Sequence, residues 1–280
     1  MGKLPLEGKM LRKIVSYAII TGVLMVTAQT GFGQGTTYFG DSEPAKSLYE
    51  IPPRVLVDAP TAGTLPRGCF DIVMRVYNNG GILGKTSIGL SNRLMLGMSY
   101  GAEDVISDYT ANANPEIEFN IKLRLIDEDY YLPALAIGFN SQGYGAWIKD
   151  RDRYTYKSKG FYGVISRSFI LQSMNAGVHA GVNYSLEYDQ DDEKDPTFFF
   201  GFDSRFQYNI GFYLEYDLAL NDDKSSAGYA KGRGYLNAGL KWMYSENLEL
   251  EFVVKDLLQN RRQDSSTFGR ELRFTYIEFF

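Results

Sequence analysis

Apolar and polar residues alternate along most of the chain between Cys69 and Phe280. The clearest example is EIEFNIKLRL at residues 116–125, where every second residue is aliphatic or aromatic and every residue between is charged or an amide. A period of two predicts a β-strand with one apolar and one polar face. Twelve segments of this kind can be read from the sequence, each close to the ~9–11 residues that a tilted membrane strand needs. They are CFDIVMRVY (69–77), GILGKTSIGL (81–90), LMLGMSYG (94–101), EIEFNIKLRL (116–125), YYLPALAIGF (130–139), KGFYGVISRS (159–168), NAGVHAGVNYSLE (175–187), TFFFGFDSRFQ (197–207), NIGFYLEYDLAL (209–220), YLNAGLKWMY (235–244), LELEFVVKDL (248–257) and RELRFTYIEFF (270–280).

The connections between these segments alternate in length. The short connections are SNR, DED, LQSM, YN and SEN. They alternate with the long connections AEDVISDYTANANP, NSQGYGAWIKDRDRYTY, DQDDEKDP, NDDKSSAGYAKGRG and QNRRQDSSTFG. Only NNGG is short where a long loop is expected. Outer-membrane barrels have short periplasmic turns and longer outer loops. The pattern predicts an all-β fold, an antiparallel 12-stranded transmembrane β-barrel formed by residues 69–280.

A soluble β-sandwich or a lipocalin-like barrel is the alternative, because these folds also show alternation. Their apolar face points into a core and their polar face is freely solvated. In this chain the polar face is mixed, since Gly177, Gly181, Gly211 and Gly239 stand in register with charged residues and tyrosines. Small residues among charges favour an enclosed, crowded lumen, and therefore the membrane barrel.

The first 33 residues have the composition of a secretory signal peptide. Four basic residues precede the apolar run IVSYAIITGVLMVTA, which small residues follow. This order predicts cleavage after Gly33, or alternatively after Ala28, and export to a bacterial outer membrane. A retained helical anchor is the other interpretation, although the run is shorter than the ~20 residues of a usual span.

Residues 34–68 carry four prolines, at positions 52, 53, 60 and 66, and show little periodicity. Proline lacks the amide hydrogen that a central strand needs, so this segment is not expected to be a barrel strand. Two interpretations stay open, an extended periplasmic segment and a plug inserted into the barrel. The extended segment is the simpler of the two.

Charge and cysteine content exclude several classes of protein. Without residues 1–33 the chain keeps 25 Lys and Arg against 33 Asp and Glu, a net charge of −8. An acidic exported chain has no electrostatic surface for nucleic acid. Cys69 is the only cysteine, so no internal disulfide can form and this residue is expected to pack as a small hydrophobic group.

The residues assigned to the lumen carry nearly balanced charges, eight basic against ten acidic. A selective channel tends to favour one sign, whereas balanced charges in a narrow enclosure suggest cross-strand ion pairs. Twelve strands also lie between the ~8 that side chains fill and the ~16–18 that leave an open channel. A narrow or plugged pore is predicted. The basic members are Arg75, Lys85, Lys122, Arg124, Arg205, Lys241, Lys255 and Arg273, and the acidic members are Asp71, Glu116, Glu118, Glu187, Asp203, Glu215, Asp217, Glu249, Glu251 and Glu271.

Catalysis is not expected from this sequence. His179 is the only histidine, so any Ser–His or Asp–His mechanism would have to use it, and the sequence pairs no nucleophile with it. The parity of its strand places His179 in the lumen, where a polar packing role is expected. No catalytic residue and no cofactor are predicted.

Two loops contain candidate binding residues. The loop DQDDEKDP places carboxylates at alternate positions, an arrangement that suits calcium or a divalent cation bridging to lipopolysaccharide. It lacks the mid-loop glycine and the final glutamate of the helix–loop–helix calcium site. A solvated loop without a metal is therefore predicted. The second loop, residues 140–156, combines aromatic with basic residues, as sugar-binding surfaces can. The ordinary aromatic girdle of a barrel is the favoured interpretation. The residues concerned are Asp189, Asp191, Glu193 and Asp195 in the first loop and Tyr144, Trp147, Tyr154 and Tyr156 in the second.

The exported barrel with an aromatic last strand resembles bacterial outer-membrane β-barrels. In that group a terminal aromatic residue belongs to the signal read by the barrel assembly machinery, which implies this role for Tyr276 and Phe280. Glu278 departs from the pattern, because its position is usually aromatic or apolar. More narrowly, the chain resembles an uncharacterised group of exported barrels labelled YjbH-like, which is linked by name to exopolysaccharide export. The resemblance covers about residues 55–280 and is carried by the motifs LPRGCFD, GFNSQGYGA, KSKGFY, GVNYSLE and YIEFF.

These features predict a porin-like protein of the cell envelope. Its leading function is a narrow channel for small solutes or oligosaccharides, and the alternative is a non-conducting structural barrel or an accessory of exopolysaccharide export. An outer-membrane hydrolase is the least favoured class. The expected partners are outer-membrane lipid, lipopolysaccharide, the assembly machinery and the polysaccharide or small solutes that would pass.

Overall fold

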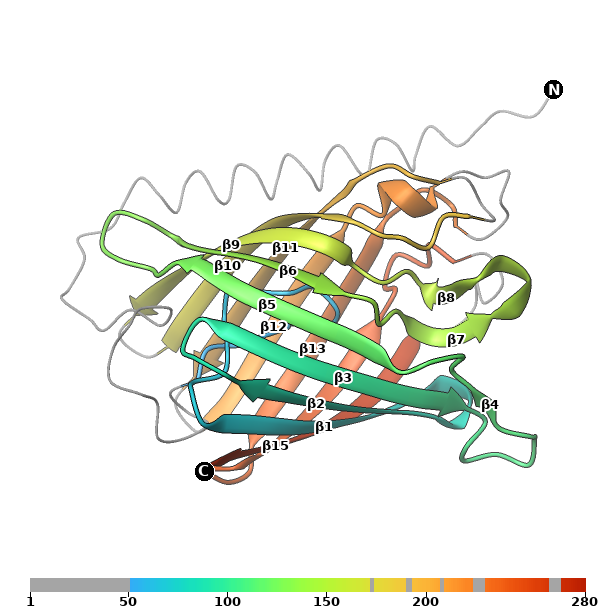
Figure 1. Ribbon diagram of the computed structural model, residues 1–280, viewed down its shortest axis with the longest axis horizontal. Coiled ribbons are helices and arrows are strands. Elements are labelled where there is room, and N and C mark those ends of the chain that lie inside the picture. Colours follow the sequence, from blue (N-terminus) through green and yellow to red (C-terminus); the bar gives the residue numbers. More distant parts are fainter. Residues whose placement is uncertain (1–50, 172–173, 190–192, 207–208, 224–229, 262–267) are drawn as a thin grey trace.

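A closed antiparallel barrel of twelve strands accounts for nearly all of the regular structure (Figure 1). The computed structural model describes residues 51–171, 174–189, 193–206, 209–223, 230–261 and 268–280; the predicted signal peptide and Asp191 lie outside these ranges. Each barrel strand pairs with the next one around the ring, which confirms the predicted fold. The strands are β1 (Cys69–Tyr77), β2 (Gly81–Gly89), β3 (Leu94–Glu103), β5 (Glu118–Ile126), β6 (Ala134–Asn140), β9 (Gly160–Leu171), β10 (Met174–Tyr184), β11 (Thr197–Phe206), β12 (Ile210–Asp217), β13 (Tyr235–Met243), β14 (Leu248–Lys255) and β15 (Gly269–Phe279).

The first and last strands close the ring. β1 pairs antiparallel with β15 from Cys69 opposite Phe279 to Tyr77 opposite Glu271, and the Phe280 amide extends the closure by donating to the Gly68 carbonyl over 2.8 Å. A complete ring leaves no open sheet edge, which is the condition for a sheet to cross hydrocarbon. We call the end near Cys69 the short-turn end and the end near Tyr77 the long-loop end.

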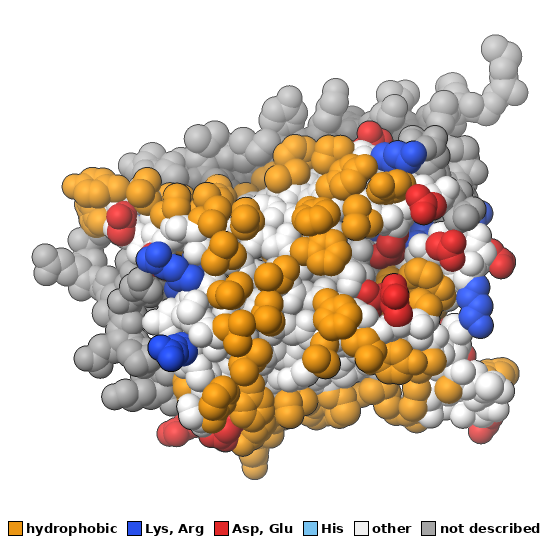
Figure 2. Space-filling view, in the orientation of Figure 1, with side chains coloured by type: hydrophobic (Ala, Val, Ile, Leu, Met, Phe, Trp, Pro, Cys, Tyr) orange, Lys and Arg blue, Asp and Glu red, His pale blue; other side chains and the backbone are white. Residues whose placement is uncertain are grey.

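The two faces of the wall have opposite polarity. Along β5 the side chains of Glu118, Asn120, Lys122 and Arg124 are buried, whereas the aliphatic and aromatic residues between them are exposed, with Phe119 at 57%. Hydrophobic side chains spread across the strands on the face in Figure 2, and charged side chains gather toward its two ends. A soluble barrel would bury the apolar set, so this distribution is that of a transmembrane barrel. No helix in the described ranges has both the length and the apolar character needed to cross a membrane.

Two smaller β elements lie in the long connections. β4 (Asn112–Ala113) extends the edge of β3, and β7 (Tyr144–Ile148) pairs with β8 (Arg153–Tyr156) to form a hairpin between β6 and β9. Figure 1 shows this hairpin at the end opposite to the carboxyl terminus. The 3₁₀ turns are η2 (Asn78–Gly80), η3 (Lys149–Arg151) and η5 (Leu220–Asp222).

The connection that was unexpectedly short is a tight turn built on left-handed residues. Asn79 and Gly80 have φ values of 60° and 63°. Glycine adopts this region without steric cost, and asparagine tolerates it better than most residues. These two residues let β1 and β2 join directly at the long-loop end, where the neighbouring connections are longer.

Residues 51–68 lie inside the barrel, and we call them the inserted segment. It reverses direction at residues 56–59, where the Leu56 amide donates to the Ala59 carbonyl and Val55 bridges Pro60. Ile51 and Leu65 pack with Cys69 in an apolar cluster at the short-turn end. The segment therefore enters from that end, turns within the lumen and returns to begin β1, and Figure 1 shows it as the blue trace within the ring of strands.

Candidate functional site

The turn of the inserted segment is fixed by one carboxylate of the wall. The backbone amides of Val57, Asp58 and Ala59 donate to Glu215 over 2.8–3.0 Å, and the Asn237 side-chain amide donates to the same carboxylate over 2.8 Å. Successive amides that converge on one anion form a concave nest with a partial positive charge. Glu215 therefore holds the segment through its backbone.

Two cations of the wall hold the carbonyl groups of the same segment. The Lys122 ammonium donates to the carbonyls of Arg54 and Gly63 over 2.6 and 3.0 Å. The Arg273 guanidinium donates to the carbonyls of Leu56 and Val57 over 2.9 Å each. Hydrogen bonds from charged donors are stronger than neutral ones, so these contacts satisfy the backbone of a segment that has no strand partner.

Asp58 connects the inserted segment to an ion-pair network. Its carboxylate lies 2.7 Å from Arg75 and 2.5 Å from Lys255, and Arg75 also contacts Glu271 at 2.5 Å. Burial alone would raise the pKa of Asp58, but the charges of Lys255 and Arg75 outweigh it and hold the pKa well below its ordinary value. Asp58 therefore remains a carboxylate throughout the physiological range.

A chain of hydrogen bonds joins Ser166, His179 and Asp203 in the lumen. The His179 Nδ1 atom lies 2.8 Å from the Ser166 hydroxyl, and its Nε2 atom lies 2.7 Å from Asp203. The Ser166 hydroxyl also accepts the Ala62 amide hydrogen over 2.9 Å, so the inserted segment covers it. In this arrangement the trio anchors Ala62, and Ser166, at 1% exposure, has no open space beside it.

The β7–β8 hairpin fills the lumen from the long-loop end. The Arg153 guanidinium forms a two-point ion pair with Asp222 over 2.9 and 3.1 Å. The Tyr154 hydroxyl donates to Glu118 over 2.8 Å, and the Tyr154 amide donates to Glu187 over 2.8 Å. Arg153 and Tyr154 are almost fully buried.

The predicted aromatic girdle is wrong for three of the four loop aromatics. Tyr144, Tyr154 and Tyr156 are buried, and Trp147 packs edge-on against Tyr154 with ring centroids 4.9 Å apart. The reason is that charged side chains of the lumen contact them, which lipid could not provide: Glu118 accepts the hydroxyl hydrogen of Tyr154, and cations lie over the rings of Tyr144 and Tyr156.

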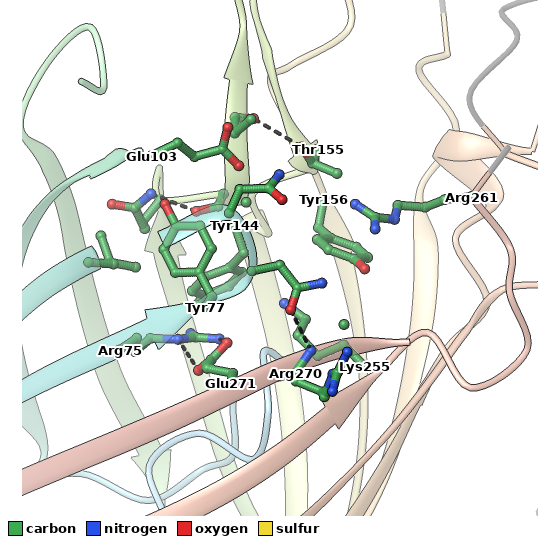
Figure 3. A pocket seen from close by; sticks show the side chains of 18 of the residues that line it. Arg75, Tyr77, Glu103, Tyr144, Thr155, Tyr156, Lys255, Arg261, Arg270 and Glu271 are labelled. Carbon is green, nitrogen blue, oxygen red and sulfur yellow. Dashed lines mark hydrogen bonds and ion pairs between the residues drawn. The ribbon is translucent and has the colours of Figure 1, made fainter. Parts of the chain in front are cut away.

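The two closures meet at two cations. Arg75 lies 4.0 Å from the ring centre of Tyr144, and Lys255 lies 5.0 and 4.2 Å from the ring centres of Tyr144 and Tyr156. Both cations also bind Asp58, so the hairpin and the inserted segment contact the same groups. Figure 3 shows Arg75, Tyr144, Tyr156 and Lys255 around one cavity.

Two cavities lie in sequence along the wall formed by β1 and β2. The outer cavity is bordered by the hairpin and by the turn at Asn78. The inner cavity is bordered by the inserted segment from Ile51 to Val55. Arg75, Leu83, Gln142 and Tyr144 line both, so the two cavities adjoin at these residues.

The residues assigned to the lumen by sequence fall into groups. Lys85, Arg205 and Lys241 line the inner cavity, whereas Arg124 binds Asp127 and the Asn92 carbonyl at the short-turn end. Glu116 is exposed and precedes β5, so its assignment to the lumen is wrong: the strand begins only at Glu118. Twelve predicted lumen side chains are buried, namely Asp71, Arg75, Glu118, Lys122, Arg124, His179, Glu215, Glu249, Glu251, Lys255, Glu271 and Arg273, and Lys85, Glu187, Asp203, Arg205, Asp217 and Lys241 are half-buried.

The remaining candidates lie near the carboxyl terminus and in the acidic loop. Tyr276 and Phe280 are exposed, and the Phe280 ring lies 6.3 Å from that of Phe70. Of the loop carboxylates, Glu193 is buried and Asp189 is exposed. Among the described residues no group of three or more His, Cys, Asp or Glu side chains is arranged to hold a metal ion.

The comparisons give structural likenesses only. No family model matches the chain, and no curated protein matches it. The chain is similar to the KdgM porin (12% identity, TM-score 0.46, 76% of this chain and 99% of that one), to the NanC porin (10%, 0.42, 75% and 99%), and to an outer membrane channel from Pseudomonas putida F1 (11%, 0.41, 79% and 100%). Likenesses this low carry no functional assignment.

Proposed function

We propose that this protein is an outer-membrane channel that passes small polar solutes or short oligosaccharides when the inserted segment leaves the lumen. The supporting observation is the pair of cavities along one wall, which adjoin at Arg75, Leu83, Gln142 and Tyr144. A barrel that served only as a scaffold would gain stability by filling this space with side chains. Polar and charged side chains line the path, so it suits hydrated solutes.

The inserted segment is the part best suited to move. In the described residues its only β-bridge, from Val55 to Pro60, is internal, and its contacts with the wall run through the ends of side chains such as Glu215 and Lys122. Water can replace these contacts when the segment withdraws. The hydrogen bonds between barrel strands do not involve the segment, so its withdrawal leaves the wall intact.

The other features of this proposal come from the sequence. Residues 1–33 direct export to the outer membrane, Tyr276 and Phe280 present the assembly signal, and lipid and lipopolysaccharide surround the apolar face. Membership of the YjbH-like group, with polysaccharide as the transported or handled polymer, is proposed on the quoted motifs alone.

A second function is favoured by the closed lumen itself. Both ends are filled in the present arrangement, and the ion pairs that join Asp58 to Arg75 and Lys255 bridge the centre. A barrel that stays in this state would be a non-conducting accessory of the envelope. Conductance separates the two functions.

The test is planar-bilayer recording of the refolded chain with and without a lock on the segment. The lock is a disulfide between cysteines introduced by Ala62→Cys and Ser166→Cys, two positions that contact each other through the Ala62 amide and the Ser166 hydroxyl, 2.9 Å apart. We expect discrete openings for the native chain and for each single variant, silence for the oxidised double variant, and recovery with a reductant. Silence of the native chain would support the accessory barrel, and unchanged openings in the oxidised double variant would exclude the segment as the gate.

A further inference from the structure

The inner cavity has an excess of positive charge, unlike the lumen as a whole. Its lining contains six basic side chains, Arg54, Arg75, Lys85, Arg205, Lys241 and Arg273, against the three acidic side chains of Asp71, Glu249 and Glu251. The complete chain is acidic, with a formal net charge of −5. The positive excess is therefore local and belongs to this cavity.

Most of these cations already have carboxylate partners. Arg54 lies 3.0 Å from Asp71, Lys241 lies 3.1 Å from Glu249, and Arg273 lies 2.9 Å from Glu251. Lys85 differs, because within the described part of the chain its ammonium makes no hydrogen bond and no ion pair. β2 presents it toward the lumen between the buried residues Leu83 and Ser87.

An acceptor in the same cavity is also incomplete. The Oδ1 atom of Asp71 is buried and has no hydrogen-bond partner in the described structure, while its Oδ2 atom pairs with Arg54. A buried donor or acceptor without a partner costs free energy. A ligand that offers an anionic oxygen to Lys85 and a hydroxyl to Asp71 would satisfy both groups.

We infer that the inner cavity binds the carboxylate or phosphate group of a small anionic solute, with Lys85 as its main cationic contact. The inference rests on the proposed channel function and names the class of solute. The cavity offers a cation on β2 and an acceptor on the adjacent strand β1, both available to one small anionic group. Arg75 and Tyr144, which line both cavities, form the boundary that such a solute would pass.

Binding is tested without any need for conduction. Isothermal titration calorimetry of the refolded chain in detergent at low salt uses inorganic phosphate and, separately, gluconate as the carboxylate probe. For a probe that binds the native chain, Lys85→Gln should lower the affinity by about tenfold or more, which is the loss expected for one charge-assisted hydrogen bond. Lys85→Arg should retain affinity within a few-fold. Lys231→Gln is the matched control, because Lys231 contacts the Gln259 carbonyl in the long loops, away from the cavity.

The outcomes separate this inference from the channel function. Heat with phosphate, with gluconate or with both supports the site and identifies the group it prefers; no heat with either, or equal affinity in Lys85→Gln, overturns it. In conducting protein, a salt gradient should give an anion-selective reversal potential that Lys85→Glu shifts toward cations. An unchanged potential would also overturn it. A silent bilayer with normal binding would refute the channel and leave the anion site.

Discussion

The inserted segment and the β7–β8 hairpin both fill the lumen, but they are held in different ways. The segment is held mainly through its backbone, with amides bound to Glu215 and carbonyls bound to Lys122 and Arg273. The hairpin is held through its own side chains, of which Arg153 and Tyr154 are the most buried. The segment is therefore controlled by wall side chains that bind its backbone and by its own Asp58, which pairs with Arg75 and Lys255, whereas the hairpin is controlled by the hairpin itself.

The covalent connections of the two closures differ as well. The hairpin is joined on both sides to barrel strands through residues 141–143 and 157–159, so it can tilt but cannot leave. Within the part of the chain that the structure describes, the inserted segment is joined to a barrel strand only at Cys69. The segment is thus the closure whose release opens a path, and changes in the wall charges should govern that release.

Asp58→Asn should have the largest effect on this comparison. It removes the one carboxylate that pairs with Lys255 and a second partner of Arg75, both buried. Removing one partner of a buried ion pair costs about 3–5 kcal/mol. In this variant the cost destabilises the state in which the segment lies in the lumen. We expect a large rise in open probability in planar bilayers and faster hydrogen exchange of residues 51–68. Asp189→Asn, in an exposed loop, is the control and should leave both measurements unchanged.

An unchanged open probability in Asp58→Asn would show that the ion pairs do not hold the segment in place. If only the hairpin amides exchanged faster, the gate would have to be assigned to the hairpin. Either result would contradict the assignment of the inserted segment, and not the hairpin, as the part that opens the channel.

The wall was predictable because its information is local. Period-two alternation places Phe119 outside and Lys122 inside without knowledge of any neighbour. The pairing of Ser166 with His179 was also within reach, since the short turn joining β9 to β10 puts these two residues opposite each other in the ladder. Asp203 follows only once the register of β11 is known.

The two closures could not be predicted in the same way. The contacts of the inserted segment use its backbone, which is the same for every sequence, and join positions as distant as Ala59 and Glu215. The direction in which loop 140–156 folds has no periodic signal, so Tyr144 and Tyr156 could not be placed. Glu116 was misplaced because the alternation continues for two residues before β5 begins at Glu118.

Glu215→Gln should have an intermediate effect. The amide oxygen of glutamine can still accept hydrogen bonds from Val57, Asp58 and Ala59, but without the negative charge that the nest of amides favours. A hydrogen bond to a charged acceptor contributes about 1.5–3 kcal/mol and one to a neutral acceptor about 0.5–1.5 kcal/mol, so the variant should hold the segment less strongly. Open probability should rise less than in Asp58→Asn. The matched control is Glu246→Gln on an exposed turn, and equal openings in the two variants would argue against the nest as an anchor.

Tyr154→Phe should have the smallest effect and should act on the other closure. It removes the hydroxyl that donates to Glu118 and leaves the ring in place, at a cost of about 0.5–1.5 kcal/mol. Hydrogen exchange of residues 144–156 should become faster, whereas open probability should stay at the native value because the inserted segment still fills the inner lumen. Tyr109→Phe, at a position 79% exposed, is the control. If the open probability rose as much as in Glu215→Gln, the hairpin and the segment would have to move together, and the lumen would have one gate made of both.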